Sequence, residues 1–534
     1  MGGSLLAQPE SAPDNWFNLD PTEDGVRGVS TERVYQELLR GRTGETVIVA
    51  VIDSGVDYDH EDLKDIMWVN AGEIAGNGID DDGNGYIDDV NGWNFIGGAK
   101  GNVAEDTYEI TRLYKMYQDR FDGVNRDDLS KKEKVEYDQY MEIKKTIDEQ
   151  RDEMEGNVAF YSGLLDKLGK LKEALGKEDI KAADLEGYEP TDPDLTQAVA
   201  ILNNVLSQGT TLPEVEEQLK GGVEYFSNSL NYGYNPDFNP RNIVGDNYND
   251  VYERYYGNND VQGPDASHGT HVSGIIGAVR GNGIGMDGVA NNVRIMSVRA
   301  VPDGDERDKD VANAIIYAVD NGASVINMSF GKGYAWDKEA VEKAIKYAAK
   351  HDVLLVHAAG NSSQDNDNTD NFPNDTYKKG RKTFDNWIEV GALSWNGGPA
   401  SFSNYGQGGV DLFAPGVDIY STIPESDYAS FSGTSMASPV TAGVAALVRS
   451  YYPDLSAKQV REILMASVDP LNEDVTLPGS DETVPFRQLS VTGGVVNAFN
   501  AVEMAAETKG KAKKKTRIKD GRTADEAPNK KDRA

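Results

Sequence analysis

The sequence predicts an α/β domain built on a mostly parallel β-sheet that is flanked by helices. Short apolar runs alternate with segments of helical periodicity, which is the pattern of repeated strand–helix–strand units. The first run, residues 47–52, contains no polar residue, as expected for a strand whose two faces are both buried. With 38% hydrophobic residues among 534, the chain has enough apolar surface for a sizeable core.

Five apolar runs are expected to be the strands of this sheet: 47–52, 293–301, 323–328, 353–358 and 388–392. Helical patterns lie between or after them at 311–321, 338–350 and 440–448, and a shorter one precedes them at 31–39. In such a sheet the carboxyl ends of parallel strands share one edge, where open α/β folds carry their sites.

The stretch from residue 97 to 256 differs from the rest of the chain in the spacing of its apolar residues. Apolar side chains recur at helical spacing over 110–121, 137–147 and 158–168, which predicts a helical insertion packed as a hairpin or a small bundle. We expect its aromatic stripes to be core, and the part after Gly222 to run as irregular loops. The insertion is a lid, a dimer contact or a substrate-recognition module, and the sequence does not choose among these.

Charge and composition narrow the class of partner. With 53 basic and 89 acidic residues the net charge is −36, which disfavours nucleic acid and suits solubility, salt tolerance or divalent cations. The chain has no cysteine, which excludes disulfides, thiol catalysis and cysteine metal sites. No apolar run approaches the ~20 residues of a membrane helix, so we expect no transmembrane segment.

Three short segments contain residue types that are used in catalysis. Asp53 opens an Asp-Ser-Gly turn directly after the first strand, and His268 lies among small residues where a helix is expected to begin. Ser435, in Gly-Thr-Ser-Met-Ala-Ser-Pro, starts a helix whose positive end favours oxyanion charge. Taken singly, the three segments could equally be a turn, a metal-binding pair of His268 with His271, and a helix cap.

Together with Asn361 in Ala-Ala-Gly-Asn, these segments resemble the active-site blocks of the subtilases, the subtilisin-like serine peptidases of family S8, in the family order Asp, His, Ser. The resemblance implies a subtilisin-like three-layer fold and a serine endopeptidase that forms an acyl-enzyme. It makes Ser435 the nucleophile and His268 the general base, oriented by Asp53. Asn361 is then the oxyanion donor, beside the Ser435 backbone N–H.

The resemblance also implies how a polypeptide substrate binds, namely as an extended strand along a cleft. One wall of the S1 pocket matches Ser329, Phe330 and Gly331, the other matches Ala358, Ala359 and Gly360, and the edge that pairs with the upstream part of the peptide contains Pro302 and Gly304. Phe330 either narrows this pocket or faces the core.

An acidic run that begins at Asp80 has the ligand spacing of a calcium loop. Positions 1, 3, 5, 7 and 9 of an EF-hand-like loop are Asp80, Asp82, Asn84, the Tyr86 carbonyl and Asp88. Position 12 carries Asn91 in place of the expected acid, and Asp89 is the candidate substitute. Because so many carboxylates would repel one another without a cation, the spacing favours Ca²⁺ over a bare acidic turn.

A second calcium site is implied by the resemblance alone. It contains Asp62 and the loop from Asn282 to Met286, where the main-chain carbonyls of Ile284 and Met286 contribute.

These inferences divide the chain into an N-terminal extension (1–45), a catalytic domain (46–96 and 257–505), the helical insertion (97–256) and a basic disordered tail (506–534). We expect a calcium-stabilised enzyme that is secreted, periplasmic or in the cell envelope, whose export signal was removed ahead of Met1. The alternatives are a subtilase-like peptide ligase or macrocyclase, and a non-proteolytic protein that binds partners through the insertion.

Overall fold

The computed structural model describes residues 11–377 and 382–511. Residues 1–10 and 512–534 lie outside this part, and with them most of the tail 506–534 that we expected to be disordered. The first two residues of that tail are not disordered, because they end the helix α13 Ala498–Glu507. The described chain forms two compact units, one up to Ala104 and from Pro240 onward, the other Glu105–Asn239. Residues 97–104 and 240–256, which we assigned to the insertion, thus group with the larger unit.

The larger unit is built on a mostly parallel sheet. Its strands are β1 Val47–Asp53, β2 Gly92–Asn94, β5 Val293–Arg299, β6 Val325–Met328, β7 Leu354–Ala358, β10 Trp387–Leu393, β11 Leu412–Pro415, β14 Asp469–Pro470 and β17 Gly494–Val495. Their order is β14-β17-β11-β10-β7-β6-β1-β5-β2, and only the pairing of β14 with β17 is antiparallel. All five strands predicted from the sequence are present.

Four further pairs of strands are antiparallel and lie outside this sheet. They are β3 Gly97–Gly98 with β4 Gly101–Asn102, β8 Thr376–Tyr377 with β9 Lys382–Thr383, β12 Ile419–Ile423 with β13 Asp427–Phe431, and β15 Asp474–Thr476 with β16 Thr483–Pro485.

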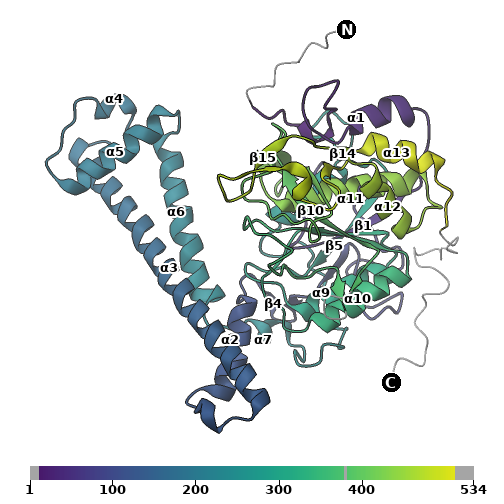
Figure 1. Cartoon of the computed structure of the whole chain (residues 1–534), viewed down its shortest axis with the longest axis horizontal. Helices are drawn as coiled ribbons and strands as arrows, with labels where there is room; N and C mark the ends of the chain where they lie inside the picture. Colours follow the sequence, from purple (N-terminus) through teal and green to yellow (C-terminus); the bar gives the residue numbers. More distant parts are fainter. Residues whose placement is uncertain (1–10, 378–381, 512–534) are drawn as a thin grey trace. The chain divides into compact units, whose positions relative to one another are not determined.

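Helices cover both faces of the sheet. They are α8 Ser267–Gly277, α9 Asp308–Asp320, α10 Lys338–Lys350, α11 Thr434–Tyr451, α12 Ala457–Ala466 and α13 Ala498–Glu507, with the shorter α1 Thr31–Arg33 and α7 Arg241–Val244. Figure 1 shows α9 and α10 on one side of the sheet, and α11, α12 and α13 on the other. In β1, Val49 and Val51 belong to the core on the α11 side, whereas Ala50 and Ile52 belong to the core on the α9 side. This two-sided burial explains the unbroken apolar run, and the predicted three-layer α/β fold is confirmed.

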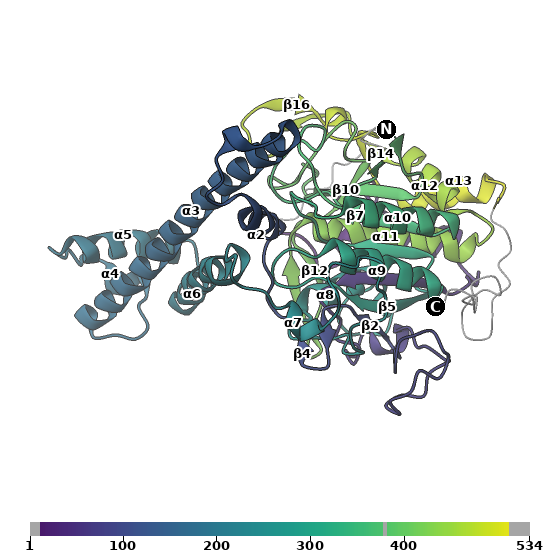
Figure 2. The same cartoon turned by 90° about the horizontal axis from the view of Figure 1, so that it is seen from below.

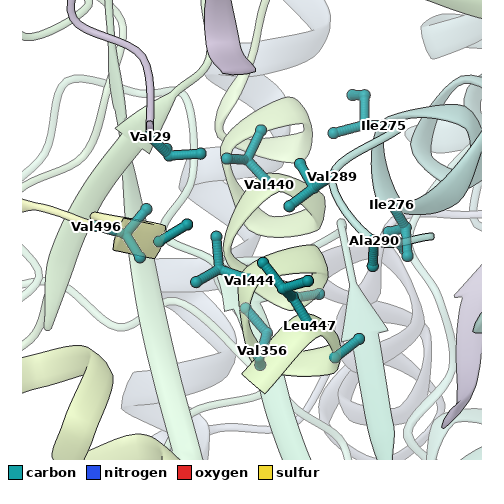
Figure 3. Packing of buried hydrophobic residues seen from close by; sticks show 14 of the residues in the cluster. Val29, Ile275, Ile276, Val289, Ala290, Val356, Val440, Val444, Leu447 and Val496 are labelled. Atoms are coloured by element: carbon teal, nitrogen blue, oxygen red, sulfur yellow. The ribbon is translucent and has the colours of Figure 1, made fainter. Parts of the chain in front are cut away.

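Helix α11 lies at the centre of the first core. Val440, Val444 and Leu447 are fully buried on it, among residues of the sheet and of α8 (Figure 3). A β-carbon at Gly443 would stand 2.6 Å from Cβ of Val289, so only glycine permits this close approach. The small residues after Ser435 therefore serve to seat the helix against its neighbours.

The smaller unit is helical, as predicted. It contains α2 Glu109–Phe121, α3 Lys131–Leu175, α4 Ala182–Leu185, α5 Pro193–Ser207, α6 Leu212–Asn228 and a π-helix at Ser229–Gly233. Helices α3 and α6 lie side by side in both views (Figure 1; Figure 2). The buried ring of Phe121 packs against Tyr137 and Tyr140 at centroid distances of 5.7 and 6.2 Å, which confirms that this aromatic stripe is core.

The prediction of irregular loops directly after Gly222 is wrong. The helix continues to Asn228 and passes into the π-helix, because Phe226 stays in phase with the buried seam and packs on Tyr161 of α3 at 5.5 Å. In the described chain, no helix combines the length and the apolar character that crossing a bilayer requires.

Candidate active site

Asp53 and His268 come together at the carboxyl end of β1. Asp53 is the last residue of that strand and is 2% exposed, while His268 is the second residue of α8. Nδ1 of His268 lies 2.7 Å from Oδ1 of Asp53, which also accepts the backbone N–H of Ser54 at 2.7 Å. Burial lowers the pKa of His268, but the charge and the hydrogen bond of Asp53 outweigh it and raise the pKa above its ordinary value.

The residue after His268 explains how the helix comes so close to the strand. A β-carbon on Gly269 would stand 2.1 Å from the carbonyl oxygen of Gly55 and 3.1 Å from Cβ of Asp53. Only glycine therefore allows the first turn of α8 to rest on the turn after β1.

His271 takes no part in this pair. It is fully buried, its Nε2 lies 3.1 Å from the carbonyl oxygen of Ala429, and its ring stacks on Phe431 at 4.3 Å. Burial lowers its pKa to about 3, which keeps the ring neutral. These contacts make His271 a packing residue that supports the helix carrying His268.

Ser435 lies in the first turn of α11, which begins at Thr434. Its Oγ donates a hydrogen bond of 3.0 Å to the carbonyl oxygen of Ser329, and Oγ of Ser329 donates one of 2.8 Å to the carbonyl oxygen of Ser435. Because the N-terminus of α11 has no side-chain cap, Ser435 is not the helix-capping serine that its position alone would suggest.

Asn361 is held beside the start of α11. Its Oδ1 accepts two hydrogen bonds of 2.9 Å, from the backbone N–H and from Oγ1 of Thr434. The amide nitrogen of Asn361 and the backbone nitrogen of Ser435 each lie 3.5 Å from the point where a β-carbon on Gly433 would stand. Two N–H donors thus flank one small space, which glycine leaves free.

The two segments expected to form the S1 walls follow β6 and β7, neighbouring strands of the sheet. Asn371 lies between them, since its Nδ2 donates to the carbonyl oxygens of Ala358 and Ala359 at 3.1 and 3.0 Å. Its Oδ1 is 2.5 Å from where a β-carbon on Gly331 would stand. Phe330 is half-buried, packs on the α9-side core and meets the ring of buried His357 edge-on, which favours its core-facing alternative.

The expected upstream edge begins where β5 ends. The backbone N–H of Val301 donates to the carbonyl oxygen of Asp53 at 3.2 Å, so the edge starts beside the candidate triad. Pro302 is buried, and Gly304 has a φ of 135°, a backbone conformation that favours glycine.

The acidic loop brings three carboxylates together. One oxygen each of Glu73, Asp80 and Asp82 lies within 4.8 Å of the others. Burial raises the pKa of Glu73, which also accepts the backbone N–H groups of Asp81 and Asp82. The EF-hand-like spacing did not predict Glu73, because this residue stands seven positions before Asp80; its acidic side chain is the only sign of it in the sequence.

The remaining residues of the predicted loop have other contacts. Asp88 accepts the backbone N–H groups of Asn77 and Gly78, and the Tyr86 ring packs in the α9-side core. Asp89 is fully buried and accepts hydrogen bonds from the side chains of Asn70, Asn84 and Tyr317. Burial raises the pKa of Asp89 to about 7.

The second expected cation site is assembled from distant segments. Asp62 is fully buried, and its Oδ1 accepts a hydrogen bond of 2.6 Å from the side-chain amide of Asn282. Oδ1 of Asn282 in turn accepts the backbone N–H of Ile284 at 3.1 Å. Met286, at the end of the loop, is buried in the α11-side core. Burial raises the pKa of Asp62, as expected for a carboxylate that has too little positive charge around it.

Asp53 and His268 form a pair at the carboxyl end of β1, and Ser435 lies at the start of α11, a helix that packs against the helix carrying His268. A parallel sheet with these residue types is typical of the α/β serine endopeptidases, and the family match shows that this chain is an enzyme of that class. It matches the subtilase family over residues 44–488 and belongs to that family.

Three relatives show how far the similarity extends. A thermophilic serine proteinase of Bacillus sp. (strain AK1) is 45% identical over 34% of this chain and 43% of its own length. Subtilisin DY of Bacillus licheniformis is 41% identical over 39% of this chain and 72% of its own length. Thermitase of Thermoactinomyces vulgaris is 36% identical over 44% of this chain and 75% of its own length. The chain thus spans less than half of the first relative and about three quarters of the other two.

Proposed function

We propose that this enzyme hydrolyses peptide bonds in polypeptides through a triad of Ser435, His268 and Asp53. The observation that carries the proposal is the 2.7 Å contact between His268 Nδ1 and Asp53 Oδ1, made across 215 residues of sequence. A buried carboxylate at this nitrogen selects the tautomer with hydrogen on Nδ1, so Nε2 is left as the acceptor that a general base needs.

In the proposed reaction the first step belongs to Ser435. Its Oγ now donates to the Ser329 carbonyl, and rotation about χ1 would turn the hydroxyl toward His268 when substrate binds. His268 then takes the proton as Oγ attacks the peptide carbonyl, and it returns the proton to the leaving amine. Water repeats the same sequence on the acyl-enzyme.

The negative oxygen of the tetrahedral intermediate needs donors that are already in place. We assign this role to the side-chain amide of Asn361 and the backbone N–H of Ser435, which flank the space beside Gly433. The two hydrogen bonds from Thr434 support the assignment, since they hold the amide oxygen and leave its nitrogen for the substrate.

We further propose that calcium stabilises the fold. Glu73, Asp80 and Asp82 would hold one ion, and Asp62 with the loop 282–286 a second; oxygen donors of this kind suit calcium. The ion would supply positive charge to carboxylates whose pKa burial now raises. Sites of so few carboxylates fit the high calcium levels outside cells, which supports a secreted or envelope location.

A labelling experiment tests the proposal. A fluorophosphonate probe and an unfolded protein substrate are incubated with wild type, with Ser435→Ala and with Ser432→Ala, an exposed serine whose Oγ accepts the N–H of Asp418. We expect wild type and Ser432→Ala to label and cleave, and Ser435→Ala to do neither. Absence of labelling in the wild type would refute the proposal, and products that are mainly joined peptides would replace it with a peptide ligase.

A further inference from the structure

Lys332 is a buried lysine next to the proposed cleft, and neither the family motifs nor the triad accounts for it. It directly follows Gly331, the last residue of the first S1 wall, and only 1% of its side chain is exposed. Burying an ammonium group is costly unless opposite charge and acceptors surround it. A lysine at this position therefore requires an explanation from its contacts.

The ammonium group of Lys332 connects the first wall to residues 306–308, which follow the upstream edge in the chain. Nζ donates 2.6 Å to the carbonyl oxygen of Glu306, two residues after Gly304, and forms an ion pair of 2.8 Å with Oδ1 of Asp308. Oδ2 of Asp308 accepts the backbone N–H of Asp337 at 2.6 Å, so the carboxylate is itself fixed between the starts of α9 and α10.

The main chain of Lys332 is tied to the second wall. Its N–H donates to the Phe372 carbonyl at 3.0 Å, and its carbonyl accepts the N–H of Phe372 at 2.8 Å. The preceding residue, Asn371, holds the carbonyls of Ala358 and Ala359. One residue thus connects three segments: the upstream edge, the first wall and the loop that supports the second wall.

We expect the upstream part of a peptide to lie as a strand between two edges, the upstream edge and the first S1 wall. These two edges must keep a fixed separation, because a strand pairs with each neighbour at about 4.7–4.9 Å. Movement of the upstream edge away from the first wall would break the main-chain hydrogen bonds to the residues before the scissile bond. We expect a smaller effect on Ser435 and His268, because none of the hydrogen bonds and ion pairs given above for the described structure joins either of them directly to Lys332 or Asp308.

We propose that Lys332 is a positioning residue that sets the spacing of the two edges between which the upstream part of a peptide is held. This inference rests on the proposed peptidase function. It predicts that Lys332 governs KM for extended substrates and has little effect on the chemical step.

The test compares a long with a short substrate. Lys332→Met keeps the length of the side chain and removes its charge, and Lys332→Met/Asp308→Asn also removes the carboxylate of its ion pair. Buried Glu306, whose carboxylate also interacts with the charge of Lys332, is unchanged in both variants. Substrates are a tetrapeptide amide and a single-residue ester with the same residue at the scissile bond. Lys458→Met is the control, since this exposed lysine on α12 pairs with Asp385 at 2.8 Å, away from the three segments that Lys332 connects.

We expect KM for the tetrapeptide to rise about tenfold in both Lys332 variants, with kcat within about threefold of wild type. Hydrolysis of the ester, the rate of fluorophosphonate labelling and all values for Lys458→Met should stay at wild-type levels. Equal losses of kcat/KM on the tetrapeptide and the ester, or no loss on either substrate, would overturn the proposal. If Lys332→Met does not fold, the same comparison is made with the double variant. A wild type that neither labels nor cleaves refutes the peptidase function instead, so the two failures are distinguishable.

Discussion

Thr434 holds the side-chain oxygen of Asn361 with two hydrogen bonds, each 2.9 Å long. Its hydroxyl oxygen also accepts the backbone N–H of Gly360 at 3.1 Å, which ties the second S1 wall to the start of α11. The residue before the candidate nucleophile therefore fixes both the oxyanion donor and the loop that carries it.

This relationship predicts the effect of removing the Thr434 hydroxyl. Thr434→Val keeps the shape and the backbone donor but loses both hydrogen bonds of the hydroxyl, so kcat should fall by about 10-fold with KM nearly unchanged. Asn361→Leu should cost about 10²–10³ in kcat, the range already measured for loss of this donor in subtilisin. Steady-state kinetics on one peptide substrate measures both. A loss confined to KM would show that Thr434 acts on substrate binding and not on the oxyanion.

The raised pKa of His268 predicts the acid limb of the activity profile. A general base must be neutral, so kcat/KM should rise with pH through a value above 6.5, the ordinary value for histidine. The contribution of the Asp53–His268 pair to the stability of the fold changes with pH in the opposite direction, falling as pH rises. The Asp53–His268 pair stabilises the fold fully below the unfolded pKa of about 6.5, and this contribution is lost as pH rises through the folded pKa.

Asp53→Asn checks both statements. Its melting temperature should lie further below wild type at about pH 5.5 than at about pH 9, and kcat should fall by about 10⁴. A melting difference that is larger at high pH would contradict the assigned direction of the pKa shift.

Gly269→Ala should disrupt the pair without changing either member. The new methyl group would stand 2.1 Å from the Gly55 carbonyl, so α8 must move away from β1. Overpacking of this kind costs about 1–3 kcal/mol, and we expect a lower melting temperature and at least about tenfold lower kcat/KM. Gly156→Ala is the control, because its β-carbon would stand in open space on α3 and should stabilise that helix by about 0.5–1 kcal/mol. Unchanged activity of Gly269→Ala would show that the approach of α8 to β1 is not required.

Chelation tests the carboxylate cluster. A ligand at 100 times its Kd stabilises a fold by about 2.7 kcal/mol, so removing calcium should lower the melting temperature by several degrees. Glu73→Gln should reduce this response, whereas Asp65→Asn, an exposed acid outside the cluster, should leave it intact. Thermal melts with calcium and with chelator provide the measurement. A wild-type calcium response in Glu73→Gln would exclude Glu73 from the site.

Part of the architecture could be predicted because it is local. The apolar run of β1 and the helical spacing in α9 and α10 are consequences of burial on known faces. The end of α6 was missed since Phe226 is ordered by packing on Tyr161, 65 positions earlier in the chain, and propensity alone favoured a loop.

By itself the sequence determined the fold class and the candidate chemical groups, because strand periodicity and short motifs are properties of neighbouring residues. Only the tertiary structure decided which distant groups meet. It showed Glu73 with Asp80 and Asp82 while Asp89 turns inward, and it brought Lys332 between the cleft segments. The physical reason is that carboxylates and buried charges take their partners from the path of the folded chain, which spacing along the sequence does not encode.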